Sequence, residues 1–458
     1  MSVSEASPET RQNGSRAAAD GAGGGLGEAS ILTSTRFVAA ALMPTLTRGL
    51  FKPRRGASKR LTQLDADRRT VEFLSGVRDK HPGQGVKLFG GRMVVLWGED
   101  AIREVLDQSA DAYASDAGAK AKGMCHFQPD ALTLSRGEEW RDRRAFTEAV
   151  LATSERVHPF AERFLAVACD EVLRLRIGDR LDWDQWERMF DRITLRVVFG
   201  DRSRDDQELT DLLEKLMGEA NRLVGLSEGD DYHAFYGCID RHLADPEPDS
   251  LVARFADAPK SDRTRVAQQV PHWLFAMRDT LGANAYRALA VIVHDPDVLA
   301  KVRAEIDGAD LTDPAAIDGL RYLEGCLHEA MRLWATTPLL ARETTRKCTL
   351  AGEQLDEGTQ VMMVNTFNHR DAAQVDDADW LKPERWEDGE RDYRFNHLSN
   401  GSQDCPGGPL VLLIGKAVIA RVLDEYDVRL EQPELKAGKP LPHMLDFFET
   451  RFAVEPRS

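Results

Sequence analysis

The sequence predicts a mainly α-helical fold with a small β-sheet region, and three stretches lead to that class. Residues 137–334 keep a helical period of about 3.6 almost without a break. Residues 86–97 form two apolar runs around a Gly-Gly pair, which is typical of a β-hairpin. Residues 348–367 alternate apolar and polar side chains as strands do. Because the strand-like stretches flank the helical one, we expect a small sheet built from both ends of the chain.

The composition is typical of a globular protein of the cytoplasm. Hydrophobic residues make up 42% of the 458 residues and charged residues 30%, enough for one large domain or a few smaller ones. The net charge of −16 argues against a nucleic-acid partner, since nothing in the sequence resembles a basic groove. The six cysteines include no Cys-x-x-Cys pair, so they suit a reducing compartment and give no sign of a zinc site or disulfide framework. No apolar run reaches about 18 residues, so we expect no transmembrane helix.

The N-terminus is expected to lie outside the ordered domain. Residues 1–55 are predicted to be a disordered or weakly ordered extension, and residues 56–458 to form a single domain. No early basic residues precede an apolar run, which argues against a secretory signal. Residues 37–43 are apolar and flanked by arginines. They could bind a membrane surface weakly, but a helix docked on the domain is the preferred interpretation.

The order of the helices follows from the apolar period and from start and stop signals. Pro271 suits the first turn of the longest helix, and Asp295-Pro296 ends that helix and opens the next. Residues 109–135 lack a clear period and are predicted to be a long loop region, often a functional feature. The predicted helices cover residues 99–106, 138–151, 159–176, 183–199, 206–224, 232–243, 271–294, 298–306, 313–334 and 410–423.

Cys405 lies where an irregular loop turns into the last of these helices. Pro406 and Pro409 suit its first turn, and residues 410–423 carry only two charges, so the helix should be buried nearly all round. The positive end of the helix favours thiolate over thiol, and Gly401 would let the backbone turn tightly beneath a flat ligand. Taken alone, a small buried cysteine that caps a core helix is the more ordinary explanation.

Glu329 and Arg332 stand three residues apart on one predicted helix. At that spacing they can form an ion pair within the helix and jointly hold a third group, such as Arg385. A pair of this kind is very common, and an exposed pair in water is its usual explanation. Its position before the Cys405 helix is what makes it a candidate.

Two further patterns could face a bound molecule. Trp140 and Arg144 are one helical turn apart, and Arg342 emerges from the Glu-x-x-Arg helix, so an indole N–H and two guanidinium groups could bind anions. Asp279 and Thr280 lie inside an otherwise apolar helix, where they are costly unless they bind something or bend the helix. The alternative is a surface-facing pair of Arg278 and Asp279, with Thr280 as filler.

Together these motifs resemble the cytochrome P450 family, because they follow its order and spacing over roughly residues 85 to 430. No single motif identifies the family, but six motifs that keep its order and spacing are specific to it. They are Trp140-x-x-x-Arg144, Ala276…Asp279-Thr280, Glu329-x-x-Arg332, Pro338…Arg342, Pro383-Glu384-Arg385-Trp386 and Gly401-x-x-x-Cys405-x-Gly407. The resemblance implies the cytochrome P450 fold, haem b (iron protoporphyrin IX) as cofactor, and a haem-thiolate monooxygenase of the soluble bacterial type.

The resemblance also implies a role for each residue. Cys405 would be the axial thiolate ligand of the haem iron, in a loop that includes Gly401 and Gly407. Asp279 and Thr280 would match the acid and alcohol that deliver protons at the oxygen site. Two sets complete the implied site: Trp140, Arg144 and Arg342 to hold the haem propionates, and Glu329, Arg332 and Arg385 to lock the fold beneath the thiolate.

Three positions depart from the family's pattern. Leu398 stands where an aromatic residue is usual, which leaves the sulfur less shielded. Gln403 replaces a basic residue and removes one propionate contact. Met277 replaces a glycine of the long helix and would narrow the space over the haem.

The implied activity is insertion of one oxygen atom from O2 into a small hydrophobic substrate of secondary metabolism. Electrons would come from a separate ferredoxin or flavodoxin-type protein, with Arg141, Arg143, Lys416 and Arg421 as a local basic docking face. Two alternatives stay open: a peroxide-dependent, fatty-acid-type peroxygenase, and a non-catalytic haem-binding protein. In the peroxygenase an arginine above the haem binds the substrate carboxylate. We expect Arg278 to point away from the oxygen site, which favours the monooxygenase.

Overall fold

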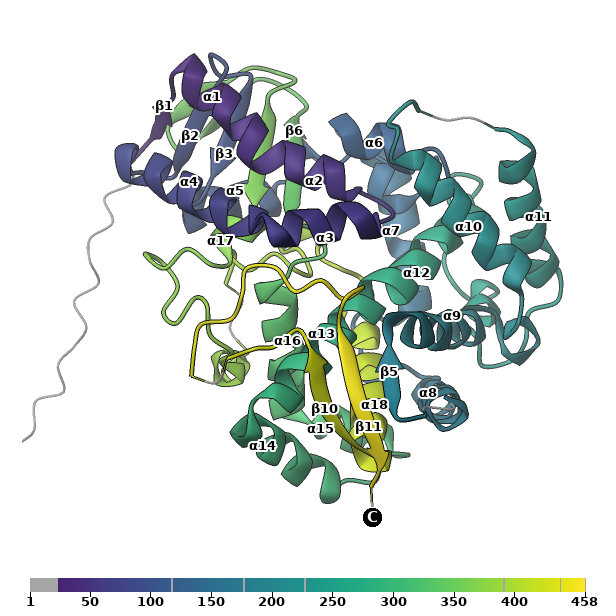
Figure 1. Cartoon of the computed structure of the whole chain (residues 1–458). Coiled ribbons are helices and arrows are strands. Elements are labelled where there is room, and N and C mark those ends of the chain that lie inside the picture. Colours follow the sequence, from purple (N-terminus) through teal and green to yellow (C-terminus); the bar gives the residue numbers. More distant parts are fainter. Residues whose placement is uncertain are drawn as a thin grey trace, which may run out of the picture.

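The main sheet draws its strands from both ends of the chain, as the sequence predicts (Figure 1). This computed structural model describes residues 24–116, 118–175, 178–225, 228–389, 392–436 and 438–457. The strand order is β1 (Leu26–Glu28), β2 (Gly85–Leu88), β3 (Met93–Leu96), β9 (Gln360–Val364), β6 (Leu339–Thr344) and β4 (Tyr113–Ala114). β2 and β3 form the predicted hairpin, and β3 then runs parallel to β9 with Val95 opposite Met362.

Two smaller sheets complete the β-structure of the described residues. One has the order β10 (Tyr426–Gln432), β11 (Arg451–Pro456) and β5 (Arg180–Asp182), and the other pairs β7 (Cys348–Leu350) with β8 (Glu353–Leu355). The three-stranded sheet is not among the predicted elements, because β5 has only three residues and β10 follows the last helix without a turn signal.

Helices make up most of the described chain, so the mainly α class with a small sheet region is confirmed. The short 3₁₀ segments are η2 (Leu132–Leu134), η3 (Asp201–Ser203), η4 (Leu251–Phe255), η5 (Val266–Gln269), η7 (Pro383–Trp386) and η8 (Gly401–Gln403), and the π-helical segments are η1 (Val38–Leu42) and η6 (Ala276–Leu281). The α-helices are α1 (Ile31–Phe37), α2 (Met43–Arg48), α3 (Arg55–Gln63), α4 (Ala66–Lys80), α5 (Glu99–Asp107), α6 (Gly118–Met124), α7 (Gly137–Leu151), α8 (Ala161–Arg174), α9 (Trp183–Phe199), α10 (Gln207–Ala220), α11 (Asp230–Ala244), α12 (Val270–Phe275), α13 (Gly282–His294), α14 (Pro296–Asp307), α15 (Pro314–Gly319), α16 (Arg321–Leu333), α17 (Asn365–Asn368) and α18 (Gly408–Glu425). In the described part of the chain, no helix is both long and apolar enough to cross a membrane.

Three predicted helix boundaries differ from the structure. The long helix 271–294 is present but has a π-helical turn, η6, between α12 and α13. The predicted helix 313–334 is two helices, because the chain leaves the helical conformation at Leu320 (φ −72°, ψ 76°). The predicted loop 109–135 contains α6, whose small residues hide any apolar period.

The ordered structure begins well before the predicted domain boundary. Residues 24–55 form β1, α1, η1 and α2, and α1 and η1 pack on α4 (purple in Figure 1). Phe37 is 1% exposed and joins an apolar cluster with Leu74 and Val86. The composition of the first thirty residues is a poor guide to the residues after them, which carry their own apolar face. Residues 1–23 lie outside the described part.

α18 lies in the helical core beneath the Cys405 loop. A Cβ atom on Gly415 would lie 2.7 Å from the Leu327 side chain, so glycine lets α16 approach closely. Lys416 is 1% exposed and its Nζ lies 2.6 Å from Glu324 Oε2. The prediction of a helix buried nearly all round is therefore confirmed.

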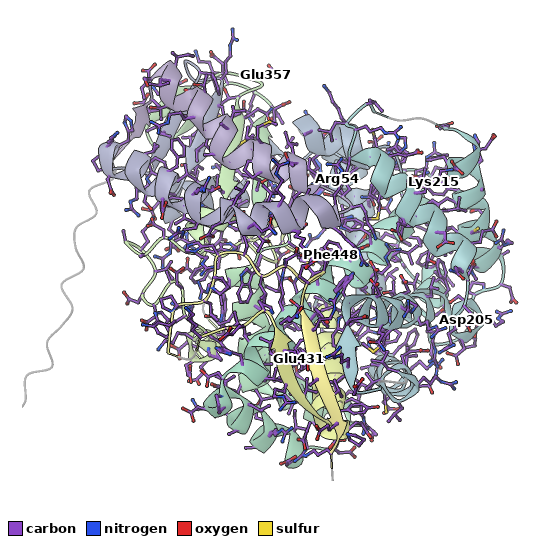
Figure 2. All side chains as sticks on the ribbon, viewed as in Figure 1. Arg54, Asp205, Lys215, Glu357, Glu431 and Phe448 are labelled. Atoms are coloured by element: carbon purple, nitrogen blue, oxygen red, sulfur yellow. The ribbon has the colours of Figure 1, made fainter. Side chains whose placement is uncertain are left out.

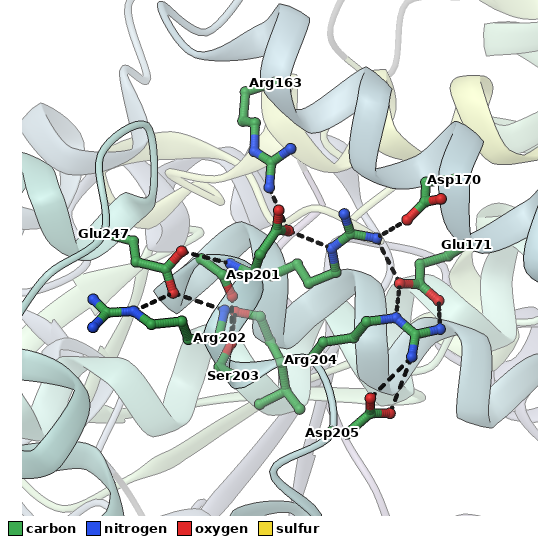
Figure 3. A network of polar contacts seen from close by, with 12 residues as sticks. Arg163, Asp170, Glu171, Asp201, Arg202, Ser203, Arg204, Asp205 and Glu247 are labelled. Atoms are coloured by element: carbon green, nitrogen blue, oxygen red, sulfur yellow. Dashed lines mark hydrogen bonds and ion pairs between the residues drawn. The ribbon is translucent and has the colours of Figure 1, made fainter.

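A network of ion pairs fixes the junction of α8, α9 and η3 (Figure 3). The buried carboxylate of Glu171 accepts two parallel hydrogen bonds from Arg204, at 2.6 Å from Nε and 2.9 Å from Nη2. Asp201 pairs with both Arg163 and Arg196. Every charge in this group has an opposite charge beside it, which is the pattern of a structural network.

Candidate active site

A cavity of about 640 Å³ is bounded by the helix α12–η6–α13 and by the loop before α18. Gly401 and the Glu329 group lie behind its wall rather than in it. The predicted residues that line the cavity are Trp140, Arg144, Asp279, Thr280, Arg342, Cys405 and Gly407. Four of the six sequence motifs, scattered over the chain, therefore contribute to the wall of one space.

Backbone hydrogen bonds hold the Cys405 loop. The Cys405 N–H donates to the Leu398 carbonyl at 2.9 Å, and the Cys405 carbonyl accepts from the Gly408 N–H at 3.1 Å. Thr153 Oγ1 donates to the Pro406 carbonyl at 2.6 Å and ties the loop to the end of α7. The thiol side chain is thus presented to the cavity by a backbone that is fixed on both sides.

The protein alone favours the thiol form of Cys405. Burial raises the pKa of the thiol, and the neighbouring Asp404 carboxylate raises it further. A hydrogen bond from the Gly407 N–H and the charge of Arg144 act in the opposite direction but do not outweigh burial. The sequence led us to expect that the positive N-terminal end of α18 would favour the thiolate. In the protein alone the thiol is favoured instead, because the cost of burying a charged sulfur exceeds the stabilisation from the helix end. A metal cation bound to the sulfur would reverse the balance.

The two glycines of the loop have different roles. Gly401 has φ +69°, and a Cβ atom there would lie 2.4 Å from the Leu106 carbonyl, so the residue packs the loop against the end of α5. That contact, and not a turn beneath a flat ligand, is what requires glycine. A Cβ on Gly407 would meet only Leu151 at 3.6 Å, an ordinary contact, so the protein itself does not require glycine there.

Two cations in the cavity wall have no carboxylate partner in the described residues. Arg342 is 2% exposed; its Nε donates to Ser109 Oγ at 2.9 Å and its Nη1 to the Ala341 carbonyl at 3.0 Å. Burial lowers the pKa of Arg342 to about 10. Lys120 Nζ donates to the Thr133 carbonyl at 3.3 Å, and burial together with Arg342 lowers the pKa of Lys120 to about 7. Both groups are arranged to bind an anion.

Lys120 is a site residue that sequence reasoning missed. It lies on α6, within the stretch predicted to be a loop, and no motif marks it. Only a helix at residues 118–124 facing Arg342 would have revealed it.

Arg144 differs from these two cations because the protein already satisfies it. Its Nε donates to Glu148 Oε1 at 2.6 Å and its Nη2 to Asp404 Oδ1 at 2.7 Å, and these partners raise its pKa. Trp140 lines the cavity one turn away. Gln403, which replaces the family's basic residue, has a buried Oε1 without a hydrogen-bond partner in the described residues. Arg144 therefore also braces the Cys405 loop through Asp404.

The Glu329 carboxylate is fully buried and is the centre of a cluster of donors. Arg332 binds it through two bonds, at 2.6 Å from Nε and 2.8 Å from Nη2. The Trp386 indole N–H and the Lys382 backbone N–H add bonds of 3.0 and 2.9 Å. Arg385 is more distant, with its Nε 3.4 Å from Glu329 Oε1. The predicted pair within the helix is thus present, and the third member is its weakest.

Asp279 and Thr280 lie in the π-helical turn η6 and line the cavity. The costly polar pair thus coincides with an irregular turn of the helix, and such turns are frequent at functional sites. Arg278 does not line the cavity. Its Nε lies 3.4 Å from Asp191 Oδ1 on α9 and 3.1 Å from Asp279 Oδ2. Burial raises the pKa of Asp191 to about 7 in spite of Arg278.

Lys52 is a second residue that the sequence did not indicate, because it lies in the segment predicted to be an extension. Its Nζ lies 3.3 Å from Glu187, 3.1 Å from Glu214 and 3.9 Å from Asp279. Met277, two residues before Asp279, is 4% exposed and lines the cavity. Asp279 is thus held between an arginine of its own helix and a lysine of the N-terminal segment.

The predicted basic docking face is mostly wrong. Lys416 is buried against Glu324, and Arg143 is 4% exposed and donates to the Arg263 carbonyl at 3.0 Å. Arg421 is paired with Asp424 at 2.9 Å. Only Arg141 is well exposed on this face, with a side chain that is 56% exposed and an ion pair of 3.2 Å to the exposed Glu138. The helical period places these residues correctly, but it does not distinguish a buried cation with a carboxylate from an exposed one.

Comparisons with known proteins agree with this geometry. The family model described as Cytochrome P450 matches residues 247–445. The chain is 27% identical over 370 residues to "Cytochrome P450 81F2" of Arabidopsis thaliana, covering 70% of this chain and 74% of that protein. It is 34% identical over 160 residues to "Cytochrome P450 99A2" of Oryza sativa subsp. japonica, covering 32% and 30%. It is 31% identical over 155 residues to "Beta-amyrin 24-hydroxylase" of Glycine max, covering 31% and 30%.

The chain matches less than half the length of most of these curated relatives. The relatives are proteins of plants and animals, so they do not bear on a bacterial type. The matched residues include the Asp279-Thr280 turn, the Glu329 cluster and Cys405, which are also the parts that the structure brings to and behind the cavity wall. With its helical core and small mixed sheet, this chain is similar to the cytochrome P450 family, whose members bind haem b.

Proposed function

We propose that the protein is a haem-thiolate monooxygenase of the soluble bacterial type that acts in the cytoplasm. The reaction inserts one oxygen atom of O2 into an unreactive C–H bond, so that R–H, O2, two electrons and two protons give R–OH and water. The observation that supports it best is that the thiol of Cys405 and the acid–alcohol pair of Asp279 and Thr280 line the same cavity. A role in secondary metabolism is part of the same proposal.

The residues in the cavity wall fit haem b. Cys405 would supply a thiolate ligand, and Arg342 and Lys120 are cations without carboxylate partners in the described residues, suited to the two propionates. Trp140, Arg144 and Gly407 border the same space. When bound, the haem supplies the oxidising chemistry, and thiolate donation favours O–O cleavage.

The chain's own task in the reaction is to move protons and to hold the substrate. Asp279 and Thr280 would pass protons into the cavity, directly or through one water. The lining is largely apolar, with side chains such as Leu132, Phe275 and Phe447, which suits a small hydrophobic substrate. Electrons would come from a ferredoxin or flavodoxin-type protein, for which Arg141 is the remaining docking candidate.

The orientation of Arg278 disfavours the peroxygenase alternative. That activity needs an arginine in the cavity to bind a substrate carboxylate, whereas Arg278 is directed to Asp191 on α9. A non-catalytic haem-binding protein would share the haem site but show no turnover.

The first test is the spectrum of the purified protein. The reduced carbon-monoxide complex should show the red-shifted band of a thiolate ligand, and Cys405→Ala should abolish it. Cys169→Ala, at a partly exposed site on α8, is the control and should leave the band unchanged. Retention of the band in Cys405→Ala, or its loss in another cysteine variant, would place the ligand elsewhere.

The second test separates oxygen from peroxide as the oxidant. With a substrate found by a spectral-shift screen, Thr280→Ala should uncouple electron use from product and release hydrogen peroxide. Arg278→Ala should do neither. Loss of peroxide-driven oxidation of a carboxylic acid in Arg278→Ala, with Thr280→Ala unaffected, would establish the peroxygenase instead.

A further inference from the structure

Arg287 on α13 is a third cation in the cavity wall without a carboxylate partner. Its side chain lines the cavity, and no carboxylate of the described residues lies within ion-pair distance of it. Its Nε donates to the Leu445 carbonyl at 3.1 Å and its Nη1 to the Trp334 carbonyl at 3.0 Å. A guanidinium group has five N–H bonds, so these two carbonyls leave most of them without an acceptor and leave the charge unbalanced.

Two carboxylates act on Arg287 from a distance, but neither cancels its charge by contact. Asp67 pairs with Arg48 at 2.8 Å. Asp446 accepts the Phe448 N–H at 3.1 Å, and burial raises the pKa of its carboxyl group, which weakens it as a counter-ion. Burial, followed by the charge of Arg48, lowers the pKa of Arg287 to about 10, so the group remains a cation at neutral pH.

Arg287 is the end of a polar row on one face of its helix. Thr280, Asn284 and Arg287 all line the cavity and are spaced by four and three residues, as neighbours on one side of a helix are. Asn284 is 4% exposed, and its side-chain amide has no hydrogen bond to any residue that the structure describes. A buried amide without a partner costs free energy, so this row is suited to a ligand that the amide can bind.

The row ends in a different part of the cavity from the proposed propionate contacts. The charges that act on Arg287 lie on α2, on α4 and in the loop between β10 and β11, whereas Lys120 is affected by Arg342. The guanidinium of Arg287 lies 5.1 Å from the centre of the Phe447 ring in that loop. The next residue, Phe448, lies close to the N-terminal helices, near the start of β11 (Figure 2).

A carboxylate is the group that matches this arrangement. It accepts two parallel hydrogen bonds from a guanidinium and supplies the missing charge, and an amide N–H can donate to it as well. We propose that Arg287 and Asn284 bind the carboxylate of an otherwise apolar substrate, whose apolar part extends along the helix toward Thr280. This assignment gives the proposed function its substrate class and rests on that function.

The distance along the helix separates this role from that of a peroxygenase arginine. Arg287 follows Thr280 by seven residues, which corresponds to about 10 Å along the helix axis. A carboxylate bound there is too far from Asp279 and Thr280 to take their place at the oxygen site. The oxidised carbon should therefore lie well beyond the α and β carbons of the acid.

Binding of carboxylic acids to the haem-loaded full chain tests this anchor. Saturated fatty acids from octanoic to hexadecanoic acid, each beside its methyl ester, would be titrated by isothermal calorimetry. In the wild type the best acid should bind about tenfold more tightly than its ester, because the ester cannot form a charge-assisted hydrogen bond. Arg287→Met should remove this preference by weakening the acid about tenfold and leaving the ester unchanged. Asn284→Ala should weaken the acid about threefold.

Two further variants separate recognition of the carboxylate from a structural role. Arg287→Lys keeps the charge and should recover part of the affinity for the acid, which a loss of packing alone would not allow. Arg241→Met removes an arginine whose side chain is 59% exposed, and it should bind acids and esters as the wild type does. Arg287→Met should also release haem at the wild-type rate, since the anchor does not hold the cofactor.

Four results would overturn the proposal. They are equal affinities of acids and esters for the wild type, an acid affinity that Arg287→Met leaves unchanged, faster haem release from that variant, and hydroxylation of a bound acid at its α or β carbon. A normal carbon-monoxide band with equal binding of acids and esters would reject the anchor and leave the proposed function standing. A preference for acids in a protein without the thiolate band would instead keep the anchor and reject the proposed function.

Discussion

Two groups of charges, one behind the cavity wall and one in it, differ in how the protein satisfies them. Behind the cavity wall, the Glu329 carboxylate has donors on both oxygens, and Arg332 donates its remaining hydrogens to the carbonyls of His369, Ala378 and Trp380. In the wall, Arg342 and Lys120 are held only by hydroxyl and carbonyl oxygens. The first group is complete within the protein, whereas the second has no counter-charge in the described residues.

The difference separates structural from ligand-binding charges. A buried charge without an opposite charge is costly, and it persists only where something other than folding stability keeps it. Removing a charge should therefore have opposite effects in the two groups. It should destabilise the protein at Glu329 and stabilise the haem-free protein at Arg342 or Lys120.

The largest effect is expected for Glu329→Ala. The change would leave the guanidinium of Arg332 buried without an opposite charge, which typically costs about 3–5 kcal/mol. Denaturant unfolding of the purified protein measures this cost. Glu208→Ala is the control, because its ion pair with Arg241 is exposed on both sides, at 62% and 59%. The control should change stability by less than about 1 kcal/mol. A similar loss of unfolding free energy in both variants would contradict the prediction, since it would show that burial of the Glu329 ion pair does not increase the cost of breaking it.

The second prediction concerns Lys120 and pH. Burial lowers the pKa of Lys120 to about 7 in the folded protein from the ordinary 10.5. As the pH falls between these values, the unfolded chain takes up a proton that the folded chain does not. The stability of the haem-free protein should therefore fall as the pH is lowered through this window, by roughly 2–3 kcal/mol once solvent in the cavity is allowed for, and level off below about pH 7.

Lys120→Met removes the titrating group, so its unfolding free energy should lack this slope. Fluorescence-monitored unfolding at several pH values compares the two proteins. An identical pH profile in the variant would mean that Lys120 is not desolvated and is no candidate for a propionate contact.

Arg342→Met should have a smaller effect of opposite sign to that of Glu329→Ala. The haem-free protein should gain about 1 kcal/mol, because an unpaired buried charge is removed. The haem-loaded protein should release haem to a scavenger about tenfold faster, since one charge-assisted hydrogen bond to the cofactor is lost. Arg241→Met on the surface should change neither quantity. Slower folding or lower stability of the haem-free Arg342→Met protein would place Arg342 in the structural group.

The sequence was sufficient for features that depend on neighbours along the chain. The spacing of Glu329 and Arg332 indicates an ion pair on one helix, and the proline-flanked Cys405 indicates a loop that enters a buried helix. It could not show that Arg342 lies close enough to lower the pKa of Lys120, because α6 and β6 come together only across the fold.

Burial was the other quantity that the sequence could not supply. Lys416 and Arg141 are both basic residues within predicted helices, yet one is enclosed against Glu324 and the other is exposed. The same reason explains why the sequence led us to expect disorder in the N-terminal segment. Its ordering depends on Phe37 meeting the cluster of Leu74 and Val86, which no local pattern reveals.

The smallest expected effect is at Arg385, and it decides how many members the Glu329 cluster has. The family resemblance treats Arg385 as an equal partner of Glu329 and Arg332. In the structure its Nε is 3.4 Å from the carboxylate and its side chain is 20% exposed, while the Trp386 and Lys382 N–H groups are closer to the same carboxylate. Arg385→Ala should therefore cost only about 0.5–1 kcal/mol, as a partly exposed ion pair does. Arg385→Lys should restore most of this loss, because Nη2 of Arg385 otherwise contributes only its bond to the Asp376 carbonyl. A loss as large as that of Glu329→Ala would instead show that three charges, and not two, act as one unit beneath the Cys405 loop.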